Sequence, residues 1–429
     1  MNNRLVYTQT DKCNALSQHF VNSHNNFQHP INPTSASAVN QSIIKINASN
    51  NSNFNRFFTL EEVYATINTI KSKKAHGPDE IPNKIIKSLP KKAILTLTKI
   101  YNSCLRLSYF PKSWKIGKVI AIPKPKKLKS LPSSYRPISL LCSFSKIFEK
   151  LILARLTDFE TEKNIIINQQ FGFRPKHSTA HQILRLCEKI TLNFNKNRTT
   201  GLLLIDLEKT FDTVWHQGLL HKLFKLHCPM YLIKIIQSFL TDRYSYVQIE
   251  NATSNQYPLP AGVPQGSVLS PALFNIFLND IPKPKKCDIA IYADDTALIA
   301  STHNHNSAQL STKLSNGFKR LNKYFEKWRI SVNNQKTAAS IFTHSPIAMN
   351  MCQQNKINIG NNTIPWLTNT KYLGIHLDQR LKFAIHIKNS IINANKILRM
   401  LYPILKKHNQ MSISNLFTPD YHICLPSLG

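Results

Sequence analysis

The chain is poor in acidic residues. Its 429 residues include only 22 Asp and Glu against 55 Lys and Arg, which gives a formal net charge of +33. The sequence is also visibly rich in Asn, Lys and Ile, as AT-rich coding produces, and such a bias can raise the lysine content. The bias does not readily explain the shortage of acids. We therefore favour a polyanionic partner, which is most often nucleic acid.

The sequence also lacks paired cysteines and long apolar runs. Its eight cysteines are scattered, with no CxxC pair and no Cys/His ligand spacing, so neither a disulfide framework nor a zinc site is predicted. No stretch reaches the ~18 apolar residues of a membrane helix, and the N-terminus has no apolar signal-peptide core. We expect an intracellular, soluble protein without a membrane partner, large enough for two or three subdomains.

Secondary-structure signals follow a polar N-terminal stretch. Residues 1–56 are rich in Asn and Ser and show little periodicity, so we predict that they are poorly ordered. Thr59 and Glu62 predict a capping box at a helix start. Ser270 and Pro271 predict another helix start, with Ser270 as N-cap. Strands and helices alternate over the rest of the chain, without an internal repeat, which predicts an α+β or mixed α/β core.

Two adjacent acids, Asp294 and Asp295, lie within the apolar stretch IAIYADDTALIA at residues 289–300. The pattern predicts a strand, a tight turn that carries the acids, and a second strand. A turn alone is sufficient to explain the pair, because Asp is a common turn residue. Only the rest of the sequence can favour a functional site over a plain turn.

A third acid, Asp206, ends the apolar run LLLID. Taken alone, an Asp at the end of a buried strand is more often a helix cap or a turn residue. Together with Asp294 and Asp295, it supplies the hard oxygen ligands that a pair of Mg²⁺ ions requires. Two such ions ~3.5–4 Å apart can activate a 3′-hydroxyl and stabilise a leaving pyrophosphate.

A glycine-containing loop, GVPQGSVLSP, occupies residues 262–271. Such a loop before a helix lets the backbone approach a nucleotide or its template base closely. By itself the signal is weak, because a plain loop before a buried helix gives the same pattern.

In chain order, the segment of Asp206, the glycine loop and the segment of the two adjacent acids resemble motifs A, B and C of a reverse transcriptase, with YADD at 292–295 as the signature. The surrounding sequence is similar to the non-LTR (LINE-type) retrotransposon polymerases, most closely the jockey-like elements of insects. The resemblance runs from about residue 57 to about residue 407. It is carried by KSKKAHGPDEIPNKIIKSLP, WKIGKVIAIPKPKK, SSYRPISLLCSFSKIFEKLILARL, NQQFGFRPKHSTAHQIL, FDTVWHQGLLHKL and WLTNTKYLGIHLDQRLKF.

The resemblance implies an α+β right-hand polymerase fold whose palm is an antiparallel sheet backed by helices. The reverse transcriptase domain would span residues 57–378, with fingers at about 57–200 and palm at about 201–378. Residues 379–429 would form a partial, truncated thumb or connection. His76 stands where the family usually carries Pro, which is a loop change remote from the chemistry. Full-length elements carry an N-terminal endonuclease that the first 56 residues cannot hold, so we expect a truncated or misassembled copy.

The resemblance also assigns roles to individual residues. The expected metal ligands are Asp206, Asp294, Asp295 and the backbone carbonyl of Leu207. The expected catalytic residues are Asp206, Asp294, Asp295 and Lys336, with Lys336 as general acid for the pyrophosphate. The expected nucleotide-binding residues are Lys124, Arg136, Phe211, Gln265 and Gly266. The expected primer grip is the KYLGI segment with Tyr372, Leu373 and Gly374.

Some of these roles compete with plainer interpretations. Phe211 would reject a 2′-hydroxyl by a clash, but it is also a candidate core aromatic paired with Trp215, and both interpretations can hold. The guanidinium fork of Arg136 suits phosphate oxygens, whereas any neighbouring lysine could replace Lys124. For Lys336, a solvated surface position is the stronger alternative in so basic a chain, and only its position favours catalysis.

The function implied by the resemblance is RNA-directed DNA polymerisation. The enzyme would add dNTPs to a DNA 3′ end on an RNA template with two Mg²⁺ ions, or Mn²⁺ as a substitute, by target-primed reverse transcription in the full element. Its partners would be the RNA template, the DNA primer and the element RNA in a ribonucleoprotein, in the cytoplasm and then the nucleus. The oligomeric state is unknown. The alternative is a catalytically silent remnant that at most binds nucleic acid; motif spacing disfavours a maturase-like or telomerase-like polymerase.

Overall fold

The apolar run before Asp206 forms β3 (Thr199–Ile205), the central strand of a five-stranded sheet. This strand is buried along nearly its whole length, as expected for a strand covered on both faces. The sheet has the order β12-β9-β3-β8-β7, with β7 at Asp288–Tyr292, β8 at Asp295–Thr302, β9 at Ala338–Phe342 and β12 at Trp366–Leu367. Its pairs are antiparallel except β12–β9.

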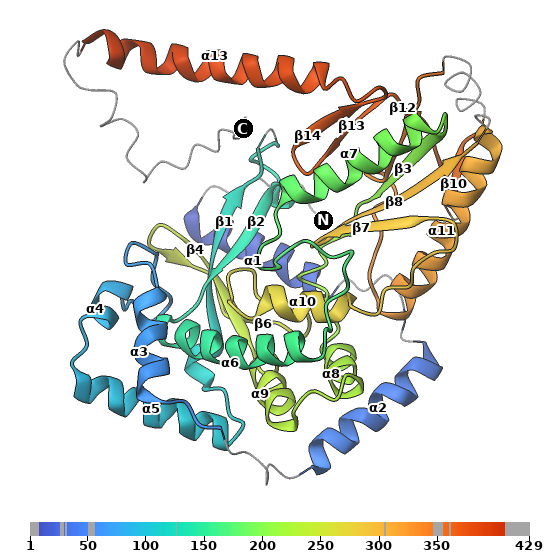
Figure 1. Cartoon of the computed structure of the whole chain (residues 1–429). Helices are drawn as coiled ribbons and strands as arrows, with labels where there is room; N and C mark the ends of the chain where they lie inside the picture. Colours follow the sequence, from blue (N-terminus) through green and yellow to red (C-terminus); the bar gives the residue numbers. More distant parts are fainter. Residues whose placement is uncertain are drawn as a thin grey trace.

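The computed structural model describes residues 8–25, 30, 32–49, 56–125, 127–303, 306–345, 355–359 and 362–407. Within these residues, helices cover both faces of the sheet (Figure 1). On one face α11 (Ser307–Lys327) packs on β3 and β8, and on the other α7 (Thr179–Asn195) packs on β3 and β7. Alternate residues of β3 accordingly join different cores: Leu203 belongs to the main core and Leu202 to a second one. The predicted α+β class and helix-backed antiparallel sheet are confirmed.

A second five-stranded sheet lies beside the first (Figure 1). It comprises β1 (Ile116–Pro123), β2 (Tyr135–Leu140), β4 (Tyr244–Ile249), β5 (Ala252–Thr253) and β6 (Tyr257–Pro258). β1 pairs antiparallel with β2 and parallel with β4. β4 comes from the range expected to be palm, so the two expected halves share this sheet.

Further helices surround an aromatic core that includes Tyr101, Phe110 and Phe148. They are α3 (Leu60–Thr69), α4 (Asn83–Lys87), α5 (Lys91–Arg106), α6 (Ser143–Glu162), α8 (His216–Lys225), α9 (Met230–Leu240) and α10 (Ser270–Leu278). Short 3₁₀ turns, η1 (Lys112–Lys115) and η2 (Pro132–Ser134), precede β1 and β2.

The two predicted helix starts have different outcomes. The capping box of α3 is confirmed, because the side chains of Thr59 and Glu62 each accept the other residue's backbone N–H at 3.1 Å. The N-cap prediction for Ser270 is wrong: α10 begins at Ser270, its N-cap is Leu269, and no side chain of the cap accepts a bond. The N–H groups at this helix start are instead accepted by Glu149 of α6, which bonds Val268 and Leu269, and by Oγ of Ser267, which bonds Leu269 and Ser270.

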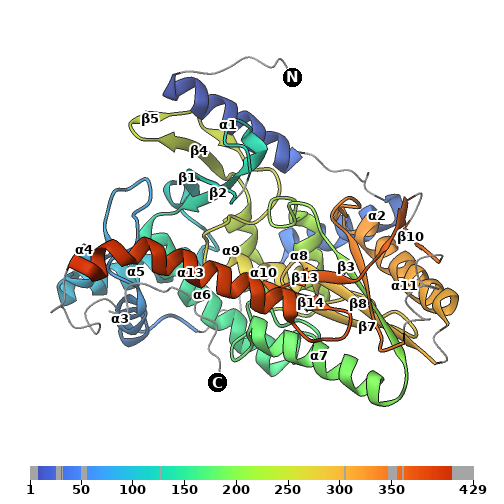
Figure 2. The ribbon, with the colours of Figure 1, turned by 90° about the horizontal axis from the view of Figure 1, so that it is seen from above.

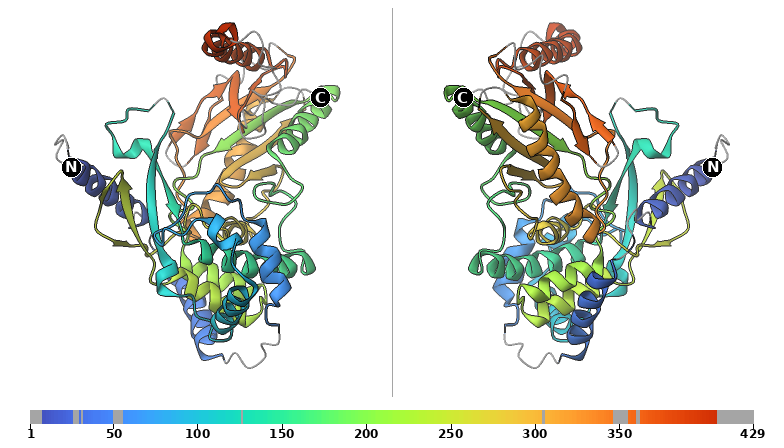
Figure 3. Two further views of the ribbon diagram at one scale, coloured as in Figure 1. Left: turned by 90° about the vertical axis from the view of Figure 1, so that its left-hand side faces the viewer. Right: turned by 90° about the vertical axis from the view of Figure 1, so that its right-hand side faces the viewer.

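The prediction of poor order for residues 1–56 is wrong for the part that the structure describes. This segment forms α1 (Gln9–Asn25) and α2 (Pro33–Ala48). Cys13, Leu16 and Phe20, spaced by three and four residues, are buried on one face of α1 against β4 and β5. α2 packs on α8. Figures 2 and 3 show α1 lying along the second sheet. The sparse apolar residues are thus enough to dock both helices.

The C-terminal part consists of two small hairpins and a long helix. The hairpins are β10 (Ile357–Ile359) with β11 (Asn362–Ile364), and β13 (Asn369–Tyr372) with β14 (Ile375–Asp378). α13 (Ala384–Lys407) follows and lies at the top of the molecule in Figure 3. The rest of the expected thumb remnant, 408–429, lies outside the described residues. None of the helices described is long and apolar enough to cross a membrane.

Candidate active site

The two acids of the YADD motif lie at a hairpin turn, as predicted. Tyr292 pairs with Asp295, so Ala293 and Asp294 form a two-residue turn between β7 and β8. Ala293 has a φ of +56°, a conformation that tight hairpin turns require at this position. In the same sheet Ile205 pairs with Thr296, so the next residue, Asp206, follows opposite Asp295. Strand register therefore brings the three acids to one edge of the sheet.

The three carboxylates influence one another electrostatically. Withdrawal from water raises the pKa of Asp294, and the charge of Asp206 raises it further. The same withdrawal, followed by the charges of Asp294 and Asp206, raises the pKa of Asp295 to about 6. Like charges held this close favour either protonation or a bound cation.

The donor set fits a hard divalent cation, because it consists of carboxylate oxygens and a backbone carbonyl. Asp206, Leu207 and Asp294 line one cavity, whereas Asp295 does not. Within the described part of the chain, no group of three or more His, Cys, Asp or Glu side chains is arranged as a ready metal site. Instead the ammonium of Lys336 lies 3.4 Å from Oδ2 of Asp206. The carboxylates are thus neighbours that are not gathered around one point.

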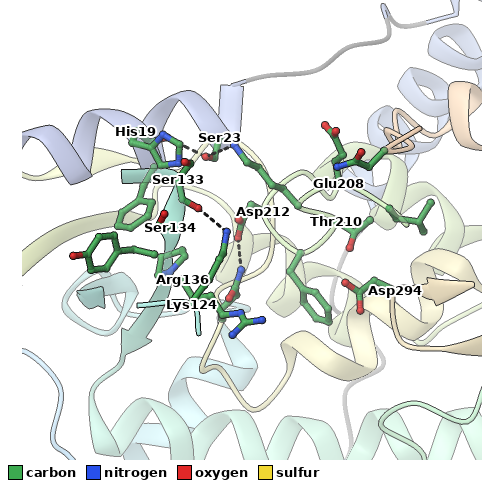
Figure 4. Close-up of a pocket in the computed structure, with 18 of the residues that line it drawn as sticks. His19, Ser23, Lys124, Ser133, Ser134, Arg136, Glu208, Thr210, Asp212 and Asp294 are labelled. Atoms are coloured by element: carbon green, nitrogen blue, oxygen red, sulfur yellow. Dashed lines mark hydrogen bonds between the residues drawn. The ribbon is translucent and has the colours of Figure 1, made fainter. Parts of the chain in front are cut away.

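The cavity has a volume of about 1080 Å³ and is bordered by both sheets. Figure 4 shows Asp294 at one end and Arg136 and Lys124 toward the other. Of the predicted site residues, the cavity is lined by Lys124, Arg136, Asp206, Leu207, Phe211, Gln265, Gly266, Asp294 and Lys336. Those that do not line it are Asp295, Tyr372, Leu373 and Gly374.

Two predicted phosphate-binding residues come from the hairpin of β1 and β2. Lys124 directly follows β1, its backbone N–H donates to the Ser134 carbonyl at 2.7 Å, and its Nζ donates to the Ser133 carbonyl at 2.8 Å. Arg136 lies on β2 opposite Ile122 and is exposed. Burial lowers the pKa of Lys124, and the charges of Lys336 and Arg136 lower it further. This end of the cavity is therefore electropositive.

The loop with Gln265 and Gly266 is fixed between β2 and the segment after Asp206. The Gln265 carbonyl accepts the N–H of Ser139 at 2.7 Å, and its Nε2 donates to Oδ1 of Asp212 at 2.8 Å. Gly266 has a φ of +123°, and a Cβ there would lie 2.3 Å from the Ser139 carbonyl oxygen. The predicted close backbone approach is thus made to β2, and only glycine permits it.

Phe211 lines the cavity and stacks on Phe274 of α10, with ring centroids 4.4 Å apart and planes 22° apart. The ring centroid of Trp215 lies 6.3 Å from that of Trp328 instead. A core pair of Phe211 with Trp215 is therefore not the arrangement found.

The loop that carries Lys336 is pinned to the strand end that carries Asp206. The Asn333 N–H donates to the Asp206 carbonyl at 2.8 Å, and Val332 forms a bridge with Leu207. Lys336 itself is largely exposed, so its position in the cavity wall and a solvated surface position are both found.

The predicted primer grip lies away from the cavity. Tyr372 is 3% exposed and packs in the second core. Leu373 and Gly374 form the turn of the β13–β14 hairpin with φ angles of +46° and +92°, and a Cβ on Gly374 would meet nothing within 4 Å. Gly374 thus faces open space, whereas Leu373 is partly buried against the second core, to which the tyrosine belongs.

Several residues that shape the site carried no predicted role. The buried Gln170 accepts with Oε1 from the N–H groups of Ala293, at 3.0 Å, and Gly172, at 2.8 Å, and so braces the YADD turn. His19, Phe20 and Ser23 of α1 complete the cavity wall. Gln170 lies in NQQFGF, which the resemblance included without a role, whereas no local signal in the polar N-terminus marked α1.

The reverse transcriptase (RNA-dependent DNA polymerase) family model matches residues 122–377. The probable RNA-directed DNA polymerase from transposon BS of Drosophila melanogaster is 38% identical over 365 residues, which cover 82% of this chain and 39% of that protein. The RNA-directed DNA polymerase from mobile element jockey of the same species is 36% identical over 366 residues, covering 83% and 39%.

Among solved structures, apo telomerase from Candida tropicalis, truncated from its C-terminal domain, matches with a TM-score of 0.42 and 13% identity, covering 63% of this chain and 54% of that one. This partial likeness carries no assignment. The chain spans about two fifths of the length of the two insect relatives. Because the family model covers more than half of the sequence, the chain belongs to the reverse transcriptase family, and its predicted likeness to jockey-type retrotransposon polymerases is confirmed.

Proposed function

We propose that this chain is the catalytic part of an RNA-directed DNA polymerase that extends a DNA 3′ end on an RNA template. The strongest support is that one cavity is lined by carboxylates at one end, Asp206 and Asp294, and by cations at the other. A nucleoside triphosphate needs both ends, because its phosphates pair with cations while its reacting phosphorus needs metal-bound oxygens.

Reverse transcriptases generally depend on divalent metal ions. Here Asp206, Asp294, Asp295 and the Leu207 carbonyl would hold two Mg²⁺ ions, or Mn²⁺ in their place, and when bound these ions activate the 3′-hydroxyl and stabilise the pyrophosphate. Asp294 is placed by the hairpin turn and Asp206 by the central strand. Placement at the ends of two paired strands fixes the backbone from which each of these ligands extends.

The remaining cavity residues would bind and orient the nucleotide. Lys124 and Arg136 would hold the triphosphate, since guanidinium and ammonium groups suit phosphate oxygens. Gln265 and Gly266 would line the pocket beneath it, and Phe211 would exclude a 2′-hydroxyl. Lys336, now beside Asp206, would donate a proton to the departing pyrophosphate.

The template and primer would be held mainly through their phosphates. Gly374 is open to an approaching strand and would contact the primer together with its neighbour Leu373, whereas the buried Tyr372 would support this turn from below. The formal charge of +33 favours phosphate contacts that do not depend on base sequence.

Incorporation of dTTP on poly(rA)·oligo(dT) with Mg²⁺ tests this proposal directly. We expect incorporation by the parent chain, none by Asp294→Asn, and parental incorporation by the matched control Asp158→Asn, whose exposed carboxylate lies 3.7 Å from Arg56. Equal incorporation by the parent and Asp294→Asn would contradict the assigned site. Binding of the duplex without incorporation by any variant would favour the silent remnant.

A further inference from the structure

The N-terminal helix α1 forms one wall of the cavity. His19, Phe20 and Ser23 all line it, and Figure 4 shows His19 and Ser23 at the end remote from Asp294. Phe20 and Ser23 are buried, at 2% and 4% exposure. A polar helix at the start of the chain thus borders the candidate site, although the family model matches only residues 122–377.

Two contacts fix α1 to the loops that carry site residues. Nδ1 of His24 lies 2.9 Å from the Asp212 carbonyl oxygen and 3.2 Å from that of Ala261, so this nitrogen donates its proton to backbone. One residue earlier, Oγ of Ser23 donates to the His19 carbonyl at 3.0 Å and accepts from Nζ of Lys209 at 2.7 Å.

Lys209 is a cation of the cavity that the resemblance did not assign. It follows Asp206 by three residues, lines the cavity, and has a φ of +45°, which a non-glycine residue adopts only when its surroundings enforce it. Burial lowers the pKa of His19, and the charges of Lys209 and Lys124 lower it further. The side chains of Lys209 and Lys124 therefore act on the same end of the cavity.

The Ser23 contact orients the Lys209 amine without neutralising it. An ammonium has three donors, and the serine oxygen takes one of them as a neutral acceptor. The other donors and the full charge are available to an anion in the cavity. A carboxylate partner would have cancelled the charge, so the arrangement suits a cation kept for phosphate.

We propose that Lys209 is a further cation for the triphosphate of the incoming nucleotide, and that α1 positions it through Ser23. This inference rests on the proposed function for the identity of its ligand. The ligand class is a nucleoside triphosphate, and inorganic tripolyphosphate shares the same chemistry.

Binding of Mg²⁺–dTTP and of inorganic tripolyphosphate to the full chain, by calorimetry, tests the proposal without requiring catalysis. We expect Lys209→Gln to weaken both about tenfold, as for loss of one charge-assisted contact, and Lys209→Arg to retain most of the affinity. Ser23→Ala should weaken both about threefold and add nothing further in the Lys209→Gln background. The matched controls on α1 are Ser17→Ala, which loses only a bond within the helix, and the exposed Lys12→Gln; neither should change affinity.

Steady-state kinetics separates a positioning effect from a general loss of structure. Ser23→Ala should raise the KM for dTTP more than it lowers kcat, and its thermal unfolding should match that of Ser17→Ala. Lys209→Gln lies at an exposed position, and an unchanged affinity of this variant for dTTP and tripolyphosphate would overturn the inference. Tighter binding in Ser23→Ala, or an equal effect of Ser23→Ala with and without Lys209, would overturn the role of α1. A parent chain that binds dTTP but incorporates none would refute the polymerase function, whereas the binding comparison would still decide the role of Lys209.

Discussion

At the scale of single residues, Phe211 shows how an aromatic side chain is held for a task. Its ring stacks on Phe274 and meets the edge of Phe173 at 5.8 Å. These contacts support the ring, which also lines the cavity. Steric exclusion of an extra hydroxyl, the role proposed for Phe211, needs such a supported wall.

Replacing Phe211 by Val should therefore admit ribonucleotides. The shorter side chain opens space in the cavity, and we expect the preference for dTTP over UTP to fall by about 10- to 100-fold, the range that steric discrimination supplies. The ratio of kcat/KM values for the two nucleotides measures this effect. Phe57→Val, at an exposed position before the start of α3, is the control; an unchanged ratio in Phe211→Val would refute the gate.

At this scale the structure brings most of the predicted residues together where the local pattern was strong, and their roles stay predictions. The cavity was lined by most of the residues that the motifs indicated. The tyrosine of KYLGI does not line the cavity, because strand alternation places its ring in the second core. Only the glycine of the following turn faces open space. A motif places a residue on a strand, whereas packing decides which face is buried.

At the scale of elements, Glu149 connects α6 to the loop with Gln265 and Gly266. It is 0% exposed and accepts from Oγ of Ser267 at 2.5 Å, from the Val268 N–H at 2.7 Å, and from Oγ of Ser145 at 3.0 Å. Oγ of Ser267 accepts from the N–H groups of Leu269 and Ser270 at this helix start, and the buried carboxylate beside it also benefits from the helix dipole.

Changing Glu149 to Gln should loosen this connection. One acceptor oxygen becomes an amide donor that faces other donors, so we expect a loss of about 2–4 kcal/mol in the free energy of unfolding. The KM for dTTP should also rise, because the loop that carries Gln265 loses its anchor. Urea unfolding and steady-state kinetics measure the two effects. The exposed Glu162→Gln on the same helix should change neither; parental stability in Glu149→Gln would contradict the anchoring role.

A second connection between elements is centred on Lys222 of α8. This side chain is 5% exposed, and its ammonium donates to the Phe277 carbonyl, to Asp280 and to the Tyr324 hydroxyl. It also lies 3.8 Å from the ring centroid of Trp328. Burial lowers the pKa of Lys222 from its ordinary 10.5 to about 7, although the charge of Asp280 opposes the shift.

This shift predicts a pH-dependent stability. Between pH 7 and 10.5 the unfolded chain binds the Lys222 proton and the folded protein releases it, so the free energy of unfolding rises with pH by up to about 1.4 kcal/mol per unit. Lys222→Met removes this contribution, and its stability relative to the parent should fall as pH rises from 7 to 9.5. Urea unfolding at several pH values measures the difference. The exposed Lys225→Met on the same helix should give a constant difference; a constant difference for Lys222→Met would refute the lowered pKa.

At the scale of the whole molecule, the excess of positive charge favours the proposed association with nucleic acid. A charge of +33 attracts a phosphate backbone over the whole surface. The cavity adds a local concentration of cations from Lys124, Arg136, Lys209 and Lys336. Such contacts displace counterions from the duplex, so salt competes with them directly.

Binding of an RNA–DNA duplex should therefore weaken steeply with salt. For a footprint of several phosphates, we expect the affinity to fall by about 10³-fold or more between 50 and 200 mM salt, with little dependence on base sequence. Fluorescence anisotropy with two duplexes of unrelated sequence measures both properties. A nearly flat salt dependence, or a large preference for one sequence, would contradict a grip based on phosphates.

The sequence by itself determined the three acids, the glycine loop and the strands that carry them, because apolar runs broken by acids and glycines report local conformation directly. Only the tertiary structure decided that α1 forms a wall of the cavity and that Glu149, together with Ser267, bonds the N–H groups at the start of α10. These contacts join residues 186 and 119 positions apart. Their partners are polar side chains in unremarkable local sequence, and their hydrogen bonds form only after the sheets and helices have packed.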